Sequence, residues 1–239
     1  MHSRTFGRIG AALAGAAIST LAFAGTAHAA AKTISVPDDF NPAYGDTRAT
    51  GHYQVQGTGL HVWTEGSTGT DKVAEYVNTD APLAGVGEPS LSYTPTTGTI
   101  PPGFQLVVDF DGDGTADGIL VGEPTYYGND WWASNGSAQF VKDGAPSHTG
   151  GSGSANHGTL DQWRGAFPDA EVLAFGFALG SGVKGDYLIN SISFAGHTYT
   201  FKASVHPGKD DCKKGGWATS TSPVFKNQGD CVSSFASAK

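Results

Sequence analysis

The sequence predicts an all-β protein built as a sandwich of two sheets. Short runs rich in β-branched and aromatic residues recur between turn signals, and the 239 residues include 35 glycines and 12 prolines. An acidic segment at 109–118 separates two apolar runs, which is the pattern of a strand, a turn and a second strand. A chain of this length can bury a sizeable core.

Residues 1–29 have the composition of a secretory signal peptide. Arg4 and Arg8 precede an apolar stretch at 9–23, and Ala27-His28-Ala29 supplies the small residues of a cleavage site. The apolar stretch is shorter than the roughly 20 residues that a membrane-spanning helix needs. We therefore expect a secreted, extracellular protein without a membrane partner, with a mature sandwich domain at 30–203.

The charge balance argues against nucleic acid as a partner. The whole chain has 14 basic and 22 acidic residues, and the expected cleavage removes two arginines and no acids, which leaves 12 against 22 and a formal charge of −10. Phosphate backbones attract proteins that carry basic surfaces. We therefore expect no nucleic-acid binding, and we expect a monomer.

The first expected strands surround a glycine-rich turn. Residues 53–56 and 60–64 alternate apolar and polar side chains around Gly57-Thr58-Gly59, which is typical of a hairpin with one buried face. Further short strands are expected at 33–36, 72–77 and 90–93.

The central hairpin is expected from 104–108 and 119–123. Both runs are continuously apolar rather than alternating, so we expect both faces to be covered. Glu123-Pro124 should then project residues 126–132 as a loop, and an apolar segment follows at 139–141.

One short helix is expected after residue 158. Thr159 and Gln162 have the spacing of a capping box, Trp163 and Phe167 share one helical face, and Pro168 ends the pattern. The closing strands of the sandwich are expected at 171–179, 187–194 and 198–201.

The two cysteines of the chain, Cys212 and Cys231, lie in its last 28 residues. In an exported protein such a pair most simply forms a disulfide. Closing a loop of this size stabilises by roughly 3 kcal/mol in the chain-entropy model. We expect a small disulfide-closed C-terminal tail at 204–239, separated from the sandwich near Pro207 and Gly208.

Parts of the chain resemble known groups of proteins. The segments 173–185, 190–192 and 199–201 resemble the closing strands of jelly-roll domains of the galactose-binding type, which implies a jelly-roll-like β-sandwich. The sequences LHVWTE at 60–65, GILVGEP at 118–124 and GSGVKG at 180–185 resemble small secreted proteins of actinobacteria. The tail, with CKKGGW at 212–217 and NQGDCV at 227–232, resembles a terminal segment of varied exported proteins, which implies an interchangeable appendage.

The acidic segment is a candidate calcium site. Its four carboxylates would repel one another strongly without a cation, and they occupy positions 1, 3, 5 and 9 of a loop whose sixth residue is glycine. Position 12 is Leu120 rather than the glutamate of a helical calcium loop. The pattern resembles the calcium loop of integrin-type propeller repeats, which implies metal ligation by Asp109, Asp111, Asp113 and Asp117. A solvated turn rich in aspartate and glycine is the alternative.

Aromatic residues after the hairpin form a candidate ligand site. Exposed aromatic rings rimmed by polar groups are typical of binding sites, although large aromatic residues more often belong to a core. Adjacent strand residues point to opposite faces, so only one tryptophan of a neighbouring pair need face the core. The candidate ligand-binding residues are Tyr126, Tyr127, Asn129, Asp130, Trp131 and Trp132.

The sequence does not favour an enzyme. It lacks the paired-carboxylate strand of jelly-roll glycosidases and the Gly-x-Ser-x-Gly elbow, and we expect His148 and His157 to be solvated in a flexible glycine- and serine-rich loop at 144–158. The leading hypothesis is a secreted, non-catalytic, calcium-stabilised protein that binds carbohydrate or other cell-surface material. A polysaccharide-acting hydrolase and a structural envelope protein are the alternatives.

Overall fold

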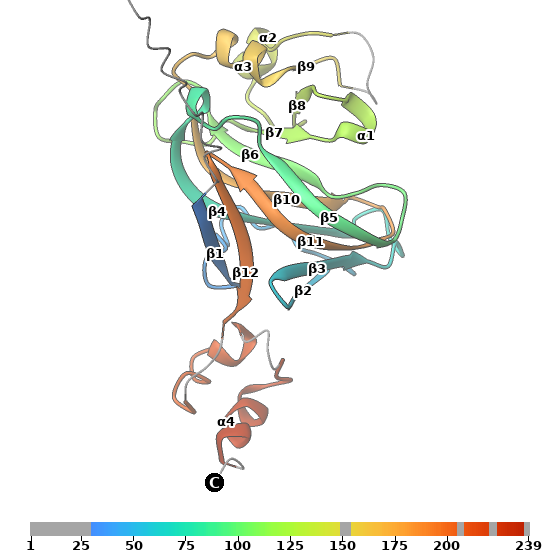
Figure 1. Ribbon diagram of the computed structural model, residues 1–239, viewed down its shortest axis with the longest axis vertical. Helices are drawn as coiled ribbons and strands as arrows, with labels where there is room; N and C mark the ends of the chain where they lie inside the picture. The colour runs from blue at the N-terminus through green and yellow to red at the C-terminus, as the bar shows by residue number, and fades with distance from the viewer. Residues whose placement is uncertain (1–29, 149–153, 205–207, 220–223, 237–239) are drawn as a thin grey trace, which may run out of the picture.

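The computed structural model describes residues 30–148, 154–204, 208–219 and 224–236. The expected signal peptide at 1–29 lies outside these ranges. Two six-stranded sheets face each other and enclose the main core, as Figure 1 shows. The predicted β-sandwich is confirmed.

The first sheet has the order β1-β12-β11-β3-β2. β12 and β3 pair with different parts of one edge of β11, and β5 pairs along its opposite edge. β1 and β12 are parallel, with Ala30 opposite His197 and Val36 opposite Ala203. The other pairs in this sheet are antiparallel. Its strands are β1 (Ala30–Val36), β2 (His52–Gln56), β3 (Gly59–Thr64), β5 (Ser90–Thr97), β11 (Gly185–Phe194) and β12 (His197–Ala203).

The second sheet has the order β4-β10-β6-β7-β8-β9 and is antiparallel throughout. The expected central hairpin forms its middle, because β6 pairs with both β7 and β10. Its strands are β4 (Lys72–Pro82), β6 (Gly103–Asp109), β7 (Gly118–Gly122), β8 (Trp131–Ala133), β9 (His157–Gly158) and β10 (Glu171–Gly180).

The second sheet is packed on both faces. All seven residues of β6 are buried, which confirms the expectation from its continuous apolar run. Leu106 and Val108 belong to the main core between the sheets, whereas Val107 packs on the outer face against Tyr76 and Tyr44. This outer cover comes from the segment before β2, which bridges to the edge strand β4.

The predicted helix is α3 (Leu160–Ala166), and it begins with the expected capping box between Thr159 and Gln162. Other short helices were not predicted. The segment at 139–141 begins a helix, and Tyr126-Tyr127 belongs to one instead of to a continuous loop. The remaining helices are η1 (Leu83–Gly85), α1 (Pro124–Tyr127), α2 (Gln139–Gly144), η2 (Gly216–Thr219) and α4 (Gln228–Ala236).

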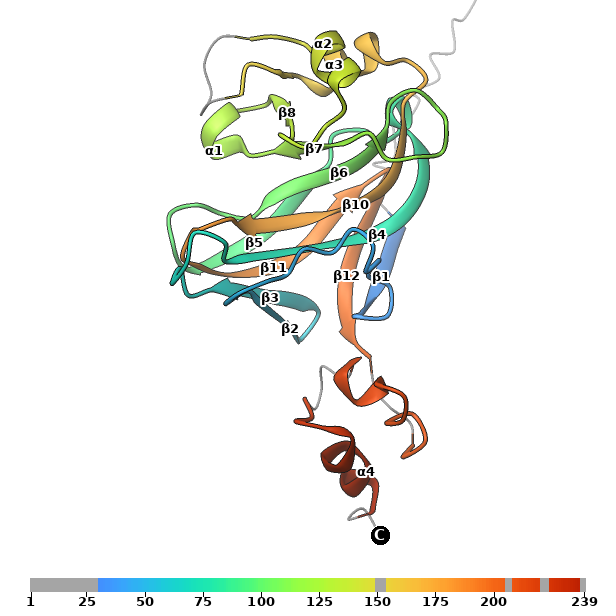
Figure 2. The same cartoon turned by 180° about the vertical axis from the view of Figure 1, so that it is seen from behind.

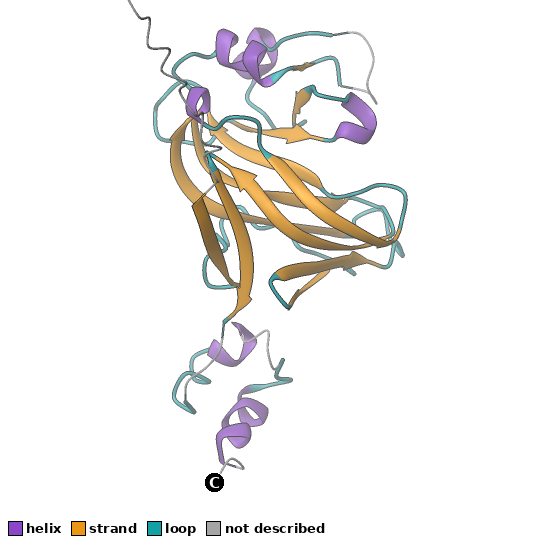
Figure 3. Ribbon diagram, in the orientation of Figure 1, coloured by secondary structure: helices purple, strands orange, loops and turns teal. Residues whose placement is uncertain are grey.

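The accessory elements lie at opposite ends of the sandwich. Both ribbon views place α1, α2 and α3 with β8 at one end, and the tail with α4 beyond the other end (Figures 1 and 2). Figure 1 shows β9 at the same end as β8. Figure 3 shows that strands dominate between the two ends. Among the described segments, no helix has the length and apolarity to cross a membrane.

The tail has its own small core. Cys212 and Cys231 form the predicted disulfide, and both are buried with Phe225, against which Trp217 and Phe235 pack. A disulfide is consistent with an oxidising, extracellular-type environment.

Candidate functional site

The turn of the β6–β7 hairpin gathers three carboxylates. Oxygen atoms of Asp109, Asp111 and Asp117 lie within 4.8 Å of one another. The loop backbone holds two of them in place: Asp109 accepts hydrogen bonds from the N–H groups of Gly112 and Gly114, both at 2.7 Å, and Asp117 accepts one from Phe110 at 2.8 Å. Each of these bonds is made within the loop itself.

These carboxylates respond differently to their surroundings. Burial alone would raise the pKa of Asp109, but the backbone N–H groups of Gly114 and Gly112 hold it below its usual value. The pKa of Asp111 is raised by desolvation and by the charges of Asp113, Asp117 and Asp109. A cation would relieve that repulsion, so Asp109, Asp111 and Asp117 could hold a metal ion.

Asp113, the fourth expected ligand, is not part of this group of three. Its carboxylate accepts a hydrogen bond from the N–H of Thr115 at 2.7 Å instead.

The aromatic segment at the opposite end of the hairpin divides between two clefts. Tyr126, Tyr127 and Trp132 line the first, which has a volume of about 450 Å³. Asn129 and the pair Asp130-Trp131 line the second, of about 460 Å³. The six predicted ligand-binding residues therefore do not form one site.

The first cleft contains a carboxyl group against aromatic rings. The indole N–H of Trp132 donates to Oε2 of Glu123 at 3.0 Å, and the ring of Tyr127 stacks on Trp132 with centroids 5.9 Å apart. Burial raises the pKa of Glu123 by more than this hydrogen bond lowers it. The rest of the wall comes from Ile100, Pro101, Asn135, Ser154, Ala178, Gly180, Ser181 and Val183.

The two adjacent tryptophans face opposite sides of β8, as expected for a strand. Trp131 is 6% exposed, packs edge-on against Phe104, and accepts a hydrogen bond at its carbonyl from the indole of Trp163 at 2.9 Å. Trp132 is half-buried and lines the first cleft. Trp131 is thus mainly structural, and Trp132 is available to a ligand.

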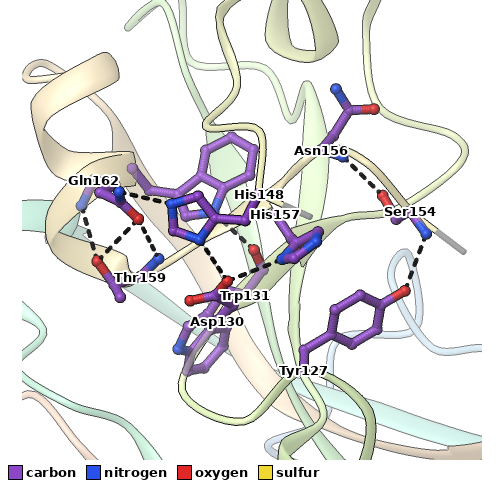
Figure 4. A network of polar contacts seen from close by, with 10 residues as sticks. Tyr127, Asp130, Trp131, His148, Ser154, Asn156, His157, Thr159 and Gln162 are labelled. Atoms are coloured by element: carbon purple, nitrogen blue, oxygen red, sulfur yellow. Dashed lines mark hydrogen bonds and ion pairs between the residues drawn. The ribbon is translucent and has the colours of Figure 1, made fainter. Parts of the chain in front are cut away.

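Two histidines converge on Asp130, as Figure 4 shows. Nδ1 of His148 lies 2.7 Å from Oδ2 of Asp130, and Nδ1 of His157 lies 2.9 Å from the same oxygen. The expectation that both histidines are solvated is wrong: the His157 side chain is 3% exposed, and His148 is half-buried. The physical reason is that β9 pairs with β8, with His157 opposite Trp132. Residues 149–153 of the expected loop lie outside the described ranges.

The helix cap fixes the hydrogen-bonding role of His148. Oε1 of Gln162 accepts from the N–H of Thr159 at 2.9 Å, which leaves its amide nitrogen 2.8 Å from Nε2 of His148 (Figure 4). An amide nitrogen only donates, so Nε2 of His148 accepts and its proton is on Nδ1, facing Asp130. Although burial would raise it, the donors His148 and His157 hold the pKa of Asp130 below its usual value.

Sequence reasoning missed this network for a structural reason. β9 has only two residues, too few to show a strand pattern, and it follows a glycine- and serine-rich segment. The capping box was the one available signal, because it places Gln162 beside whatever packs on the start of α3.

Comparison with protein-family models, with curated proteins and with solved structures found no match to the chain. A candidate function therefore rests on the geometry of the two clefts, of the three carboxylates at the β6–β7 turn, and of the network around Asp130.

Proposed function

We propose that the protein is a secreted, non-catalytic binding protein whose first cleft holds a carbohydrate. The observation that carries the proposal is the Trp132 ring, half-buried and stacked on Tyr127 beside the carboxyl group of Glu123. An aromatic face buries a large apolar area against a sugar ring at small entropic cost. A carboxylate next to it accepts hydrogen bonds from sugar hydroxyls.

The cleft supports binding better than hydrolysis. Glycoside hydrolysis uses two carboxyl groups, roughly 5 to 9.5 Å apart, on either side of the scissile bond. Among the described residues that line the first cleft, Glu123 is the only acid. A polysaccharide-acting hydrolase would need its second carboxyl group from elsewhere.

We propose calcium as the ion of the acidic turn. Asp109, Asp111 and Asp117 offer only oxygen atoms, which are the ligands that calcium prefers. Their loop is at the opposite end of β6 and β7 from the cleft. Val108 pairs with Gly118 at the loop end, and Phe104 pairs with Gly122 at the cleft end. The ion would brace the hairpin without touching the sugar.

A glycan array probed with the purified protein tests the carbohydrate proposal. Trp132→Ala should lower the affinity for any captured glycan at least tenfold, or about 1.4 kcal/mol. Trp63→Ala is the matched control, because Trp63 is also half-buried and stacks on His61 but does not line the cleft. Failure to capture any glycan, or equal binding by Trp132→Ala, would overturn the proposal.

A further inference from the structure

We propose that Asp130, His148 and His157 form a binding site for a divalent transition-metal ion of the zinc class. The two Nδ1 atoms and Oδ2 of Asp130 all lie within 4.8 Å of one another. The side chains come from three separate segments and point at one another (Figure 4). This site is distinct from the acidic turn and from the first cleft.

The donor set selects the metal. Two imidazole nitrogens and one carboxylate oxygen suit zinc and its first-row neighbours, whereas calcium takes oxygen ligands. The acidic turn offers only carboxylate oxygens, so the two clusters should bind different ions. Three protein ligands leave a tetrahedral zinc ion one open position.

The ligands are already held in place. His157 is fixed by the β8–β9 pairing and is 3% exposed, and the Asp130 side chain is 17% exposed. His148 is the outermost of the three at 37%. An ion can therefore reach the cluster from the His148 side, and binding requires little rearrangement of the buried ligands.

Metal binding requires the Nδ1 proton to move on both histidines, because each ring now donates from Nδ1 to Asp130, and Gln162 affects this move on His148. The ion takes the lone pair of Nδ1, so a neutral ring must carry its proton on Nε2 instead. The amide nitrogen of Gln162 would then face the N–H of His148 Nε2, so that two donors oppose each other. In the metal-free form it donates to the lone pair of that same nitrogen. Gln162 thus favours the metal-free form, and it acts on the metal only through His148.

Replacing Gln162 with glutamate should reverse this preference. Glutamate is a standard partner in a capping box, so its carboxylate can still accept from the N–H of Thr159. It can also accept from a protonated Nε2 of His148, as carboxylates commonly do for metal-bound histidines. Gln162→Glu should therefore tighten metal binding at least threefold while the ligand variants weaken it.

An ion at this position would also change the second cleft. Asp130 lines that cleft together with Trp131 and Asn129. A bound ion adds positive charge at its wall, so an anionic or strongly electron-donating group would be favoured there.

The test is calorimetric titration of the chelator-treated full chain with zinc chloride, together with the visible absorption of the cobalt(II) form as a signature of imidazole coordination. We expect one ion per chain at this site, and an affinity at least tenfold lower in His148→Ala and in Asp130→Asn. His148 is half-buried, so its replacement should leave the fold intact. His61→Ala is the matched control, because His61 also contacts a single aspartate, Asp186, at 2.8 Å.

Specific outcomes would overturn the site. Absence of zinc binding, equal loss in His61→Ala and His148→Ala, or loss of zinc binding in Asp109→Asn would each do so. A cobalt spectrum that His148→Ala leaves unchanged would exclude coordination by His148 and with it the three-ligand site. Unchanged or weaker binding in Gln162→Glu would refute the role of Gln162.

Discussion

The two ends of the β6–β7 hairpin hold their carboxylates by different means. At the turn, Asp109 accepts hydrogen bonds from Gly112 and Gly114 of its own loop. Beyond the other end, Asp130 accepts from His148 and His157, which are 18 and 27 residues further along the chain. The turn is organised locally, whereas the Asp130 cluster exists only when β9 has docked on β8.

The two sites therefore depend to different degrees on packing elsewhere in the molecule. A local loop can keep its geometry when distant packing is weakened. A cluster assembled from three segments loses its geometry as soon as one segment moves. We therefore expect the acidic turn to tolerate core mutations that abolish the Asp130 cluster.

Trp131→Ala should have the largest effect, and it should disrupt the surroundings of Asp130 while it spares the acidic turn. Removing a buried aromatic side chain costs roughly 3 to 5 kcal/mol, and Trp131 also anchors β8 beside Asp130. Trp132→Ala is the matched variant and should cost about 1 kcal/mol, the value of a lost aromatic pair. Denaturant unfolding of both variants checks this. Equal losses would show that both rings belong to the core.

Calcium should stabilise the protein through the carboxylates of the β6–β7 turn and not through Asp130. A ligand that binds only the folded state stabilises it by about 2.7 kcal/mol at 100 times its Kd. Thermal unfolding with excess calcium, compared with chelator, should show a rise in Tm that Asp109→Asn largely removes and Asp130→Asn retains. A melting curve indifferent to calcium would refute the calcium proposal.

Acid should reveal a feature that both ends share. The pKa values of Asp109 and Asp130 are lowered in the folded state, so each contributes stability above its unfolded pKa of about 3.9 and loses it as the pH falls through the lower folded value. In chelator, Asp109→Asn and Asp130→Asn should therefore each flatten the fall in stability below about pH 4. An acid limb as steep as in the unmodified protein would contradict the hydrogen-bond accounts given for the two carboxylates.

Glu123 should show the opposite pH dependence with the smallest effect. Its pKa is raised in the folded state, so stability is lost as the pH rises above the unfolded value of about 4.3 and through the higher folded one. Glu123→Gln keeps an acceptor for the Trp132 indole and removes this loss. We expect a small gain in Tm at neutral pH that vanishes below pH 4. A loss of stability at neutral pH would show that the charge itself is needed.

Local patterns predicted much of the fold. The turn between β2 and β3, the central hairpin, the capping box of α3 and the disulfide each depend on residues close in sequence or on a single possible pairing. The acidic turn was predictable for the same reason, because its donors and acceptors lie within nine residues.

Other features depended on context that the sequence does not display. β4 includes Pro82 and β5 includes Pro95. Proline is disfavoured within strands except at the edges of sheets, and both of these are edge strands. Pro124 sits at the first turn of α1, where proline is favoured, but the four residues of this helix are too few to show a helical pattern. The Asp130 cluster could not be foreseen, because a two-residue strand brings His157 to it.

The parallel pairing of β1 with β12 has a consequence for the order of folding. Ala30 lies opposite His197, so this edge joins residues that almost the whole sandwich separates in sequence. Closing so long a loop carries a large entropic cost before any contact repays it. The first strand must wait, unpaired on this side, until the last strand of the sandwich is available. If the chain passes through a narrow channel with its N-terminus first, β1 can therefore pair with β12 only after almost the entire sandwich has emerged.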